Sequence, residues 1–511
     1  MLMVSLLLVL GGCEGDDGDD GAAGAAGAAG AAGADGADGA DGADGGNSAV
    51  NVAVDVITTQ ANDLRGVTYS TVGANANKIY VSGHVGITDA TRQVVVGRLF
   101  ADGTPDPSFA TDGFLELTVT AASGDSDDET SLGITELPGG DLMVIAQGLT
   151  DAVNPEISVY LLRIAPDGTQ VAGWGDADGK VEVVFGTANA DNATFPGFAT
   201  GARPEDKAWD IRTDPSATGD RVVIFGIGSA GDGTRTDQDR YIARYDISAT
   251  GATADASFNG GATYAFAGGA GLRDNARRGM VAADGSIVSA GYTDPGDGNE
   301  WVVLIKLTAA GALDPDFGGF SGSADIGAAT PGIAVFNPYF DDGGFAESYA
   351  VGMQSTGSIV TVGYGGATAT TATGSSLGYE VTVRQDVVAF RVVAGASAEE
   401  DLSFGNGGEL AIQSEGKGFP TAEDRGRHMV VLPDDRILIA GRFGGNAAAF
   451  VLTDMGVPDT RVFGDGVIEL PNATVTSQFF GIALSPDGTR VVLTSNSNDN
   501  GARVVVVKAS S

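Results

Sequence analysis

One sequence pattern recurs along most of this chain. It consists of a short apolar strand pattern, a turn of the Asp-Gly type, a second apolar pattern ending in Gly, a third strand pattern, and an acidic loop centred on an aromatic residue. The clearest copies of that loop are residues 104–109 (TPDPSF), 253–258 (TADASF), 313–319 (LDPDFGG), 399–408 (EEDLSFGNGG) and 458–466 (PDTRVFGDG). A self-similar unit of roughly 60 residues, sometimes stretched to about 85, indicates stacked or radially arranged supersecondary units.

The repeat resolves into quartets of strand patterns from about Asn51 to the end of the chain. The first pattern is VAVDVIT (52–58), followed by GVTYSTV, KIYVSGH and QVVVGRL, which are rich in β-branched or aromatic residues and are separated by turn residues. Later quartets follow the same plan, and helical patterns are few. An all-β fold with about seven four-stranded units favours a β-propeller over a sandwich or a barrel.

Glycines and aromatic residues recur at fixed points of the unit. The pairs Asp284-Gly285, Asp487-Gly488 and Gly219-Asp220 predict tight hairpins, which need positive φ. A Gly at the end of the second strand suits a bend or the close approach of neighbouring blades, and it recurs as Gly83, Gly148, Gly226, Gly291, Gly363 and Gly441. We interpret the recurrent loop aromatics as wedges between adjacent blades; they are Phe109, Trp174, Phe258, Phe317, Phe404 and Phe463.

The sequence VVLPDDRILIAGR (430–442), followed by a strand and then a loop of the LDPDFGG type, resembles the delta-60 repeat. That repeat occurs in predicted propellers of bacterial surface and secreted proteins, and the resemblance covers most of the chain from Asn51 onward. Trp174 replaces the Phe of the family pattern in one copy. The resemblance implies a propeller but no established reaction that could be transferred to residues of this chain.

The N-terminal residues resemble the signal of a bacterial lipoprotein. The apolar run from Leu2 to Leu10 is too short to span a bilayer and suits a secretory signal. It leads through two glycines to Cys13, as in a lipobox, so we predict a signal peptide at 1–12 and a lipidated Cys13. The first basic residue of the chain is Arg65, so either the start lies upstream or the signal is atypical.

From Gly15 to Gly45 every third residue is Gly. This period resembles collagen, in which only Gly fits at the crowded axis of three chains, and a collagen-like stalk would make the protein a trimer. The tract contains no Pro and no basic residue to pair with its Asp residues, which favours a flexible, self-repelling spacer and a monomer. We therefore divide the chain into a signal (1–12), a spacer (13–48) and a propeller (49–511).

The charge balance narrows the classes of partner. The chain has 28 basic and 67 acidic residues, a formal net charge of −39, which argues against nucleic-acid binding. Such a surface suits a saline habitat and collects divalent cations. Cys13 is the single cysteine, so the chain has no intrachain disulfide and no thiolate metal cluster.

Motifs that carry chemistry are scarce. The two histidines, His84 and His428, are far apart in the repeat array, and each is interpreted as a structural or surface residue at a strand end. Oxygen-rich, Gly-flanked loops are the best candidates for calcium, although a solvated acidic turn is the simpler interpretation and neither loop has EF-hand spacing. The weak calcium candidates are Asp125, Asp127, Asp128, Glu129, Asp176 and Asp178.

We expect a lipid-anchored protein of the bacterial cell envelope, at the outer membrane or cell surface, whose propeller is a noncatalytic module for a protein or polysaccharide partner. Insertions at 187–203 and 367–385 would diversify one propeller face. The alternatives are a propeller hydrolase or lyase acting on an extracellular glycan, and a structural surface-layer component. Several carboxylates converging on the central funnel would favour the enzyme, whereas apolar and small residues there would favour the binding module.

Overall fold

The computed structural model describes residues 53–55, 63–86, 92–120, 129–149, 157–185, 206–229, 238–266, 274–294, 299–319, 330–339, 344–366, 385–393, 400–412, 424–462, 465–469, 478–496 and 502–508. The predicted signal, Cys13 and the Gly-repeat tract lie outside these residues, as do the predicted insertions apart from Gln385. No helix in the described part of the chain is long and apolar enough to cross a membrane.

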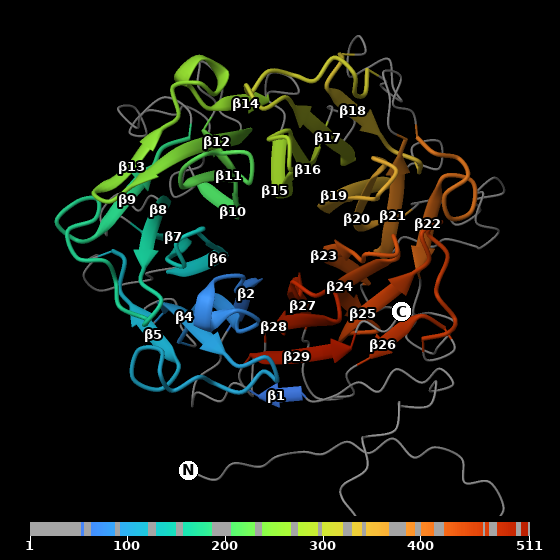
Figure 1. The fold of residues 1–511 in the computed structure, drawn as a ribbon. Helices are drawn as coiled ribbons and strands as arrows, with labels where there is room; N and C mark the ends of the chain where they lie inside the picture. Colours follow the sequence, from blue (N-terminus) through green and yellow to red (C-terminus); the bar gives the residue numbers. More distant parts are fainter. Residues whose placement is uncertain are drawn as a thin grey trace, which may run out of the picture. The chain divides into compact units, whose positions relative to one another are not determined.

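The described residues form seven antiparallel sheets arranged as blades around one axis (Figure 1). We number the blades from 1 to 7 in chain order, starting with the sheet that contains β2. The first strands surround the axis and are β2 (Asp63–Tyr69), β6 (Thr130–Glu136), β10 (Lys207–Thr213), β15 (Asp274–Val281), β19 (Phe345–Met353), β23 (Arg425–Val431) and β27 (Phe479–Leu484). Each contacts the first strand of the next blade, and β27 contacts β2, so the ring is closed. The predicted seven-bladed propeller is therefore confirmed.

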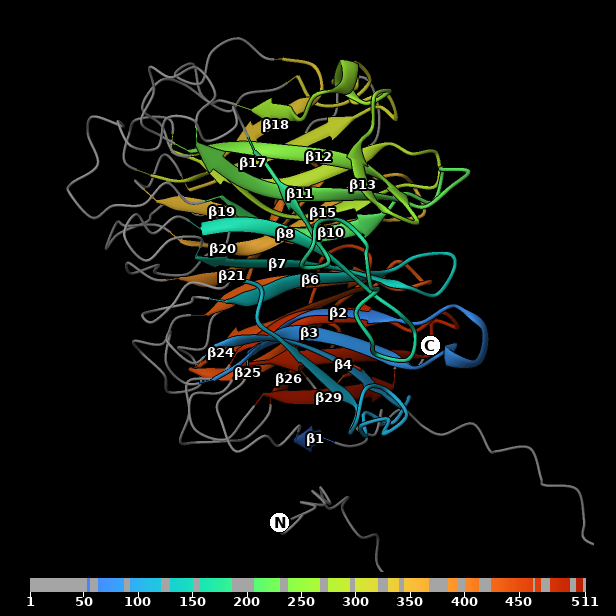
Figure 2. The ribbon, with the colours of Figure 1, turned by 90° about the vertical axis from the view of Figure 1, so that its left-hand side faces the viewer.

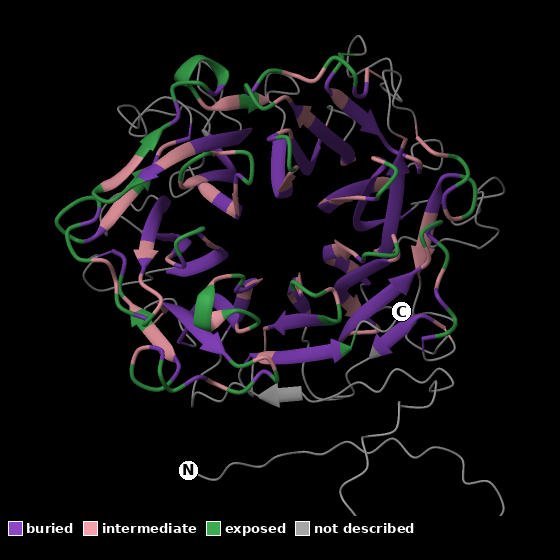
Figure 3. Ribbon diagram, viewed as in Figure 1, coloured by how far each residue is buried: buried purple, intermediate pink, exposed green. Residues whose placement is uncertain are grey.

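The second and third strands form the body of each blade. The second strands are β3 (Ile79–Val85), β7 (Leu142–Leu149), β11 (Arg221–Ser229), β16 (Ile287–Thr293), β20 (Ile359–Gly366), β24 (Ile437–Phe443) and β28 (Arg490–Ser495). The third strands are β4 (Gln93–Leu99), β8 (Ile157–Ile164), β12 (Gln238–Ser248), β17 (Trp301–Leu307), β21 (Asp386–Val392), β25 (Asn446–Leu452) and β29 (Arg503–Lys508). Neighbouring blades cover both faces of these strands, which explains their nearly continuous apolar sequences (Figure 3).

The outer strands are short. They are β5 (Phe114–Leu117), β9 (Lys180–Val183), β13 (Gly251–Ala254) with β14 (Tyr264–Phe266), β18 (Ile333–Phe336), β22 (Glu409–Ile412), β26 (Val467–Glu469) and β1 (Ala53–Asp55). Two 3-10 turns, η1 (Gly73–Asn75) and η4 (Asn259–Gly261), lie in the connections. Successive strands run across the thickness of the ring, so the loops gather at its two faces (Figure 2).

One strand assignment from the sequence is wrong. The pattern VAVDVIT was expected to begin the first blade, but β1 pairs with β29 and is the outer strand of blade 7. The pairing joins the two ends of the propeller, since Ala53 lies opposite Val505. A repeating strand pattern has the same appearance whichever strand begins a blade, and only the closed ring distinguishes the alternatives.

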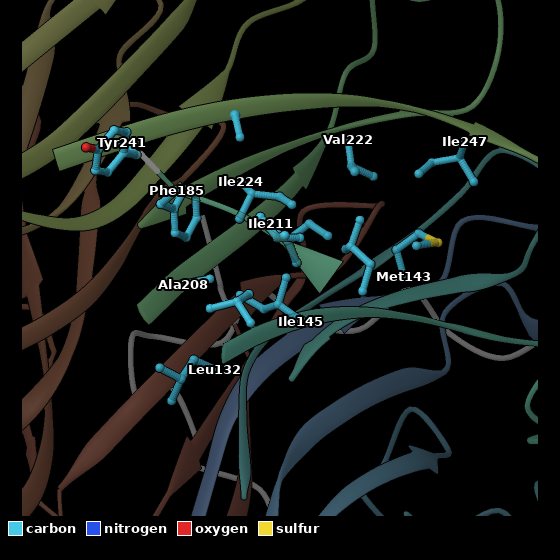
Figure 4. Packing of buried hydrophobic residues seen from close by; sticks show 14 of the residues in the cluster. Leu132, Met143, Ile145, Phe185, Ala208, Ile211, Val222, Ile224, Tyr241 and Ile247 are labelled. Atoms are coloured by element: carbon cyan, nitrogen blue, oxygen red, sulfur yellow. The ribbon is translucent and has the colours of Figure 1, made fainter. Parts of the chain in front are cut away.

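The hydrophobic core lies between blades rather than within one. In the cluster between blades 2 and 3, Met143 and Ile145 of β7 face Val222 and Ile224 of β11 (Figure 4). Clusters that join neighbouring blades also contain the loop aromatics Phe109, Trp174, Phe258, Phe317 and Phe404, each at most 2% exposed. The predicted wedge role is confirmed for these five residues, and Phe463 lies outside the described residues.

Acidic residues of the wedge loops have structural partners. Asp255 accepts hydrogen bonds from the backbone nitrogen and hydroxyl of Ser257, and its Oδ2 lies 2.7 Å from Nε of Arg244 inside the third strand. Arg244 Nη1 also donates to the carbonyl oxygen of Ala309 in the next blade. Equivalent pairs are Arg98 with Asp106, Lys306 with Asp314, and Arg391 with Asp401. The acidic loops therefore stabilise the junctions between blades.

The repeated glycines serve the backbone of their own blade. A Cβ on Gly83, Gly291, Gly363 or Gly441 would lie only 1.7 to 2.0 Å from a carbonyl oxygen of the first strand of the same blade. The nearest partner at these four positions is thus the adjacent strand and not the predicted neighbouring blade, although Arg240 of blade 3 would lie only 2.1 Å from a Cβ on Gly291. Of the three predicted hairpin pairs, Gly285 and Gly488 have positive φ, and Gly219 is not among the positive-φ glycines of the described residues.

Candidate functional site

Every first strand is interrupted by a register shift in its pairing with the second strand. A β-bulge of this kind re-aims a side chain. The residues inside these shifts, which we call the bulge residues, are Arg65, Leu132, Trp209, Arg277, Arg278, Tyr349, Arg427 and Phe480. Since all seven strands surround the axis, the bulges bring together residues that lie far apart in the sequence (Figure 1).

Arginines and aromatic rings alternate around this layer. The guanidinium carbon of Arg277 lies 4.3 Å from the ring centroid of Trp209 in blade 3 and 4.6 Å from that of Tyr349 in blade 5. The guanidinium carbon of Arg427 lies 4.8 Å from the Tyr349 ring and 5.7 Å from the Phe480 ring of blade 7. Such contacts each contribute up to about 2 kcal/mol when desolvated. They hold the first strands of five consecutive blades in one layer.

Arg278 connects opposite sides of the ring. Its Nη2 donates to the carbonyl oxygen of Arg65 in blade 1 (3.0 Å) and to that of Phe480 in blade 7 (2.9 Å). Its Nη1 lies 3.7 Å from Oδ1 of Asp210 in blade 3. Burial lowers the pKa of Arg278 to about 10, opposed by the charge of Asp210, so this side chain remains cationic at neutral pH.

A second connection across the ring runs from Arg212 in blade 3 to His428 in blade 6. Nη2 of Arg212 lies 3.1 Å from Nε2 of His428. Nδ1 of His428 accepts a hydrogen bond from the backbone nitrogen of Ile482 in blade 7 (3.1 Å). Burial, together with the charges of Arg278 and Arg212, holds the pKa of His428 well below its usual range, so the imidazole is neutral at neutral pH.

We call Arg65, Asp210, Arg212, Arg278 and His428 the axial cluster. Two carboxylates offset part of its charge, because Arg212 Nε lies 2.9 Å from Asp210 Oδ2 and Arg65 Nε lies 2.7 Å from an oxygen of Asp63. Three guanidiniums against two carboxylates leave the axis with an excess of positive charge. This contrasts with a chain whose formal net charge is −39. The cluster can therefore attract and hold an anionic group.

Three of the six predicted calcium ligands, Glu129, Asp176 and Asp178, lie in the described part of the chain. Asp125, Asp127 and Asp128 lie outside the described residues. Glu129 is fully buried, and its Oε1 accepts hydrogen bonds from the backbone nitrogens of Val119 (2.9 Å) and Thr120 (2.7 Å), which is a structural role. Calcium binding at these loops stays a prediction.

The second calcium loop forms an acidic turn. Asp176 Oδ1 accepts from the backbone nitrogens of Asp178 (2.9 Å) and Lys180 (3.1 Å). Asp178 is exposed and lies 3.7 Å from the Lys180 ammonium. No group of three or more potential metal ligands occurs among the residues that the structure describes.

The predicted strand-end position of His428 is wrong. This residue was interpreted as a structural or surface residue at a strand end, whereas it lies inside β23, 4% exposed, on the propeller axis. His84 lies inside β3, and its Nδ1 is 3.0 Å from the Thr130 hydroxyl of the next blade. The usable signal was the unusual density of arginine in three of the first-strand segments, DLRG (63–66), NARRG (275–279) and RGRH (425–428).

Two segments of the chain, residues 77–109 and 282–317, match a family described as a domain of unknown function (DUF5122) beta-propeller. The segments lie in blades 1 and 4, and each ends at the wedge aromatic of its blade. The protein is thus a seven-bladed β-propeller, and two of its repeats are similar to those of this family. No curated protein matches the sequence significantly.

Several solved structures resemble the chain weakly. A protein of unknown function from Dyadobacter fermentans is 10% identical, with 91% of this chain and 99% of that chain covered and a TM-score of 0.39. The Dos1 propeller is also 10% identical, with coverage of 90% and 94% and a TM-score of 0.39. The soluble aldose sugar dehydrogenase of Escherichia coli is 11% identical, with coverage of 70% and 94% and a TM-score of 0.36. Because these TM-scores are below 0.5, the resemblances support no inference about function.

Proposed function

We propose that this protein is a lipoprotein of the bacterial cell envelope whose propeller is a noncatalytic binding module for a protein or polysaccharide partner. Lipidation of Cys13 would anchor the chain, and the spacer (13–48) would hold the propeller away from the membrane. The proposal for the propeller depends on one observation, the rigid cationic cluster on its axis.

The axial cluster is better suited to binding than to proton transfer. A general base needs a lone pair within reach of its substrate and a pKa near the working pH. The Nδ1 lone pair of His428 is already used by the backbone nitrogen of Ile482, and the pKa of His428 is far below neutrality. Asp63 and Asp210 are each held by an arginine. Carboxylates lining the central funnel were expected of a glycan hydrolase or lyase, and apolar or small residues were expected of a binding module. The axis matches neither expectation. Its fixed hydrogen-bond donors nevertheless favour the binding of a ligand over catalysis.

The binding proposal is tested with the full chain on glycan and surface-protein arrays, with calcium or with a chelator. Saturable binding without consumption of the ligand is expected. Calcium-dependent binding would support the prediction for the loops that contain Asp125 and Asp176. Cleavage of a bound glycan would contradict a noncatalytic role.

The anchoring proposal is tested separately by fractionation of cells that express the chain or its Cys13→Ser variant. The natural chain is expected in the membrane fraction and to incorporate a labelled fatty acid. The variant should lose both properties, and retention of both by the variant would contradict lipidation at Cys13.

One observation favours the second candidate, a glycan hydrolase or lyase. Burial raises the pKa of Glu400 to about 7, and the charge of Glu409 adds to this effect. A carboxyl that is protonated near neutral pH can serve as a general acid. If array glycans are cleaved, the Glu400→Gln variant should bind them without cleaving them, and undiminished cleavage would exclude Glu400 from the chemistry.

A further inference from the structure

We propose that Arg212, Arg278 and His428 form a binding site for one carboxylate group on the propeller axis. This inference rests on the proposed function, for which it supplies the chemistry of the ligand. The three side chains come from β10, β15 and β23, so the site exists only in the closed ring.

The tautomer of His428 shows that an acceptor is missing between this ring and Arg212. A backbone nitrogen can only donate, so Nδ1, which lies 3.1 Å from the nitrogen of Ile482, is the acceptor. A neutral imidazole with an unprotonated Nδ1 carries its proton on Nε2. Nε2 faces Nη2 of Arg212 at 3.1 Å, and a guanidinium has no acceptor. Two donors therefore point at each other inside a site where His428 is 4% exposed.

A carboxylate resolves this conflict. If its oxygens lie between Nε2 of His428 and the guanidinium of Arg212, both donors gain a charge-assisted hydrogen bond, which is stronger than a neutral one. Arg278, whose Nη1 lies 3.7 Å from Asp210, adds a second positive charge to the same region. Anion binding would also favour the protonated form of His428 and raise its pKa.

The neighbouring charges select the class of anion. Asp210 contacts both Arg212 and Arg278, and Asp63 contacts Arg65, so each added negative charge meets repulsion from two carboxylates. A singly charged group is therefore favoured over a doubly charged phosphate or sulfate. The planar pair of oxygens in a carboxylate also matches the guanidinium fork.

The route to the site is provided by Arg212. Its side chain is 35% exposed, compared with 11% for the side chain of Arg278. Arg212 lies at the end of β10, next to Thr213, the last residue of that strand. A ligand would therefore meet the exposed guanidinium first and then displace it from the His428 ring.

The two histidines allow a direct test in the full chain. Nitrogen-15 labelling of histidine gives ring signals from His84 and His428 alone, so His84 is an internal control. Titration with acetate is expected to shift the His428 signals saturably, whereas chloride at the same concentration should not. Glucuronate is titrated in parallel, and binding tighter than that of acetate would identify a sugar acid as the source of the carboxylate.

Matched variants distinguish binding at this site from a nonspecific effect of positive charge. Arg212→Gln should weaken acetate binding by about ten-fold or more, because it removes a charged hydrogen bond. Arg461→Gln removes a guanidinium outside the axial cluster that is 71% exposed and faces Asp459, and it should bind acetate as well as the natural chain. Equal losses in the two variants, or equal shifts with chloride, would overturn the proposal, as would no saturable shift at all.

Failure of the carboxylate site can be distinguished from failure of the proposed binding module. Array ligands that bind the Arg212→Gln variant as tightly as the natural chain would leave the binding module intact and refute the carboxylate site. Saturable acetate binding with no array ligand would support the site and contradict the module.

Discussion

The pairing of Arg244 with Asp255 allows a quantitative test of how the wedge loops stabilise the propeller. Both side chains are almost fully buried, at 3% and 4% exposed. Although burial by itself raises the pKa of Asp255, hydrogen bonds from Ser257 and the charge of Arg244 outweigh it and lower the pKa. The substitution Asp255→Asn removes the charge and keeps an oxygen that can accept from Ser257, so it isolates the ion pair.

The chain offers a matched comparison in the next blade. Lys306 and Asp314 hold the equivalent positions at 2.9 Å, but their side chains are 23% and 15% exposed. Solvent screens this pair, and the ammonium can rehydrate when Asp314→Asn removes its partner. The two substitutions therefore make the same chemical change at the same point of the repeat and differ chiefly in burial.

The expected magnitudes follow from that difference. Removing one partner of a buried pair costs about 3–5 kcal/mol, whereas an exposed pair contributes about 0.2–1 kcal/mol. Asp214 lies 3.7 Å from Arg244 and partly replaces the lost charge, so we expect the lower end of the first range. For a propeller of roughly 460 residues, an unfolding entropy of about 2.1 cal/mol/K per residue converts 1 kcal/mol into about 1 °C. Asp255→Asn should lower the Tm by about 3 °C, and Asp314→Asn by at most about 1 °C.

Calorimetric melting at pH 7 measures both shifts. Equal shifts in the two variants would refute the argument that burial sets the strength of these pairs. If the Asp255→Asn chain does not fold, the double variant Arg244→Met with Asp255→Leu decides the question. It should recover most of the stability, because replacing both partners of a buried pair leaves no unpaired charge.

Three further predictions concern single residues. Glu400→Gln should raise the melting temperature at pH 8 but not at pH 4, because the raised pKa of Glu400 makes the natural fold lose stability as pH rises from about 4.5 to about 7; equal effects at both pH values would contradict this. In melting experiments, Gly168→Ala should destabilise the fold by more than Gly173→Ala. Both glycines have positive φ, but a Cβ on Gly168 would lie 2.4 Å from the Ala110 nitrogen, whereas a Cβ on Gly173 would meet nothing within 4 Å. The lowered pKa of His428 makes the fold lose stability as pH falls below about 6.5. The melting temperature of the His428→Gln variant should therefore depend less on pH than that of the natural chain between about pH 6.5 and 4. An unchanged pH dependence would contradict a neutral buried imidazole.

Much of the fold was predictable because its signals are local. A hairpin turn such as Asp284-Gly285, an apolar strand such as β16 and a wedge such as Phe258 each depend on a few consecutive residues and recur along the chain. The repeat therefore determined a propeller of about seven blades. The signal, Cys13 and the Gly-repeat tract are likewise features of the sequence alone, and their roles stay predictions.

Features that depend on closure of the ring of blades are visible only in the tertiary structure. β1 belongs to blade 7 because the two ends of the ring must pair, and no local pattern distinguishes that arrangement from a blade beginning at β1. Arg278 of the axial cluster donates to the carbonyl oxygens of Arg65 and Phe480, each more than 200 positions away in the sequence. Their meeting requires a bulge in each first strand and a ring small enough for an arginine to reach across it. The sequence thus determined which residues form blades, and only the closed ring determined which of them meet at the axis.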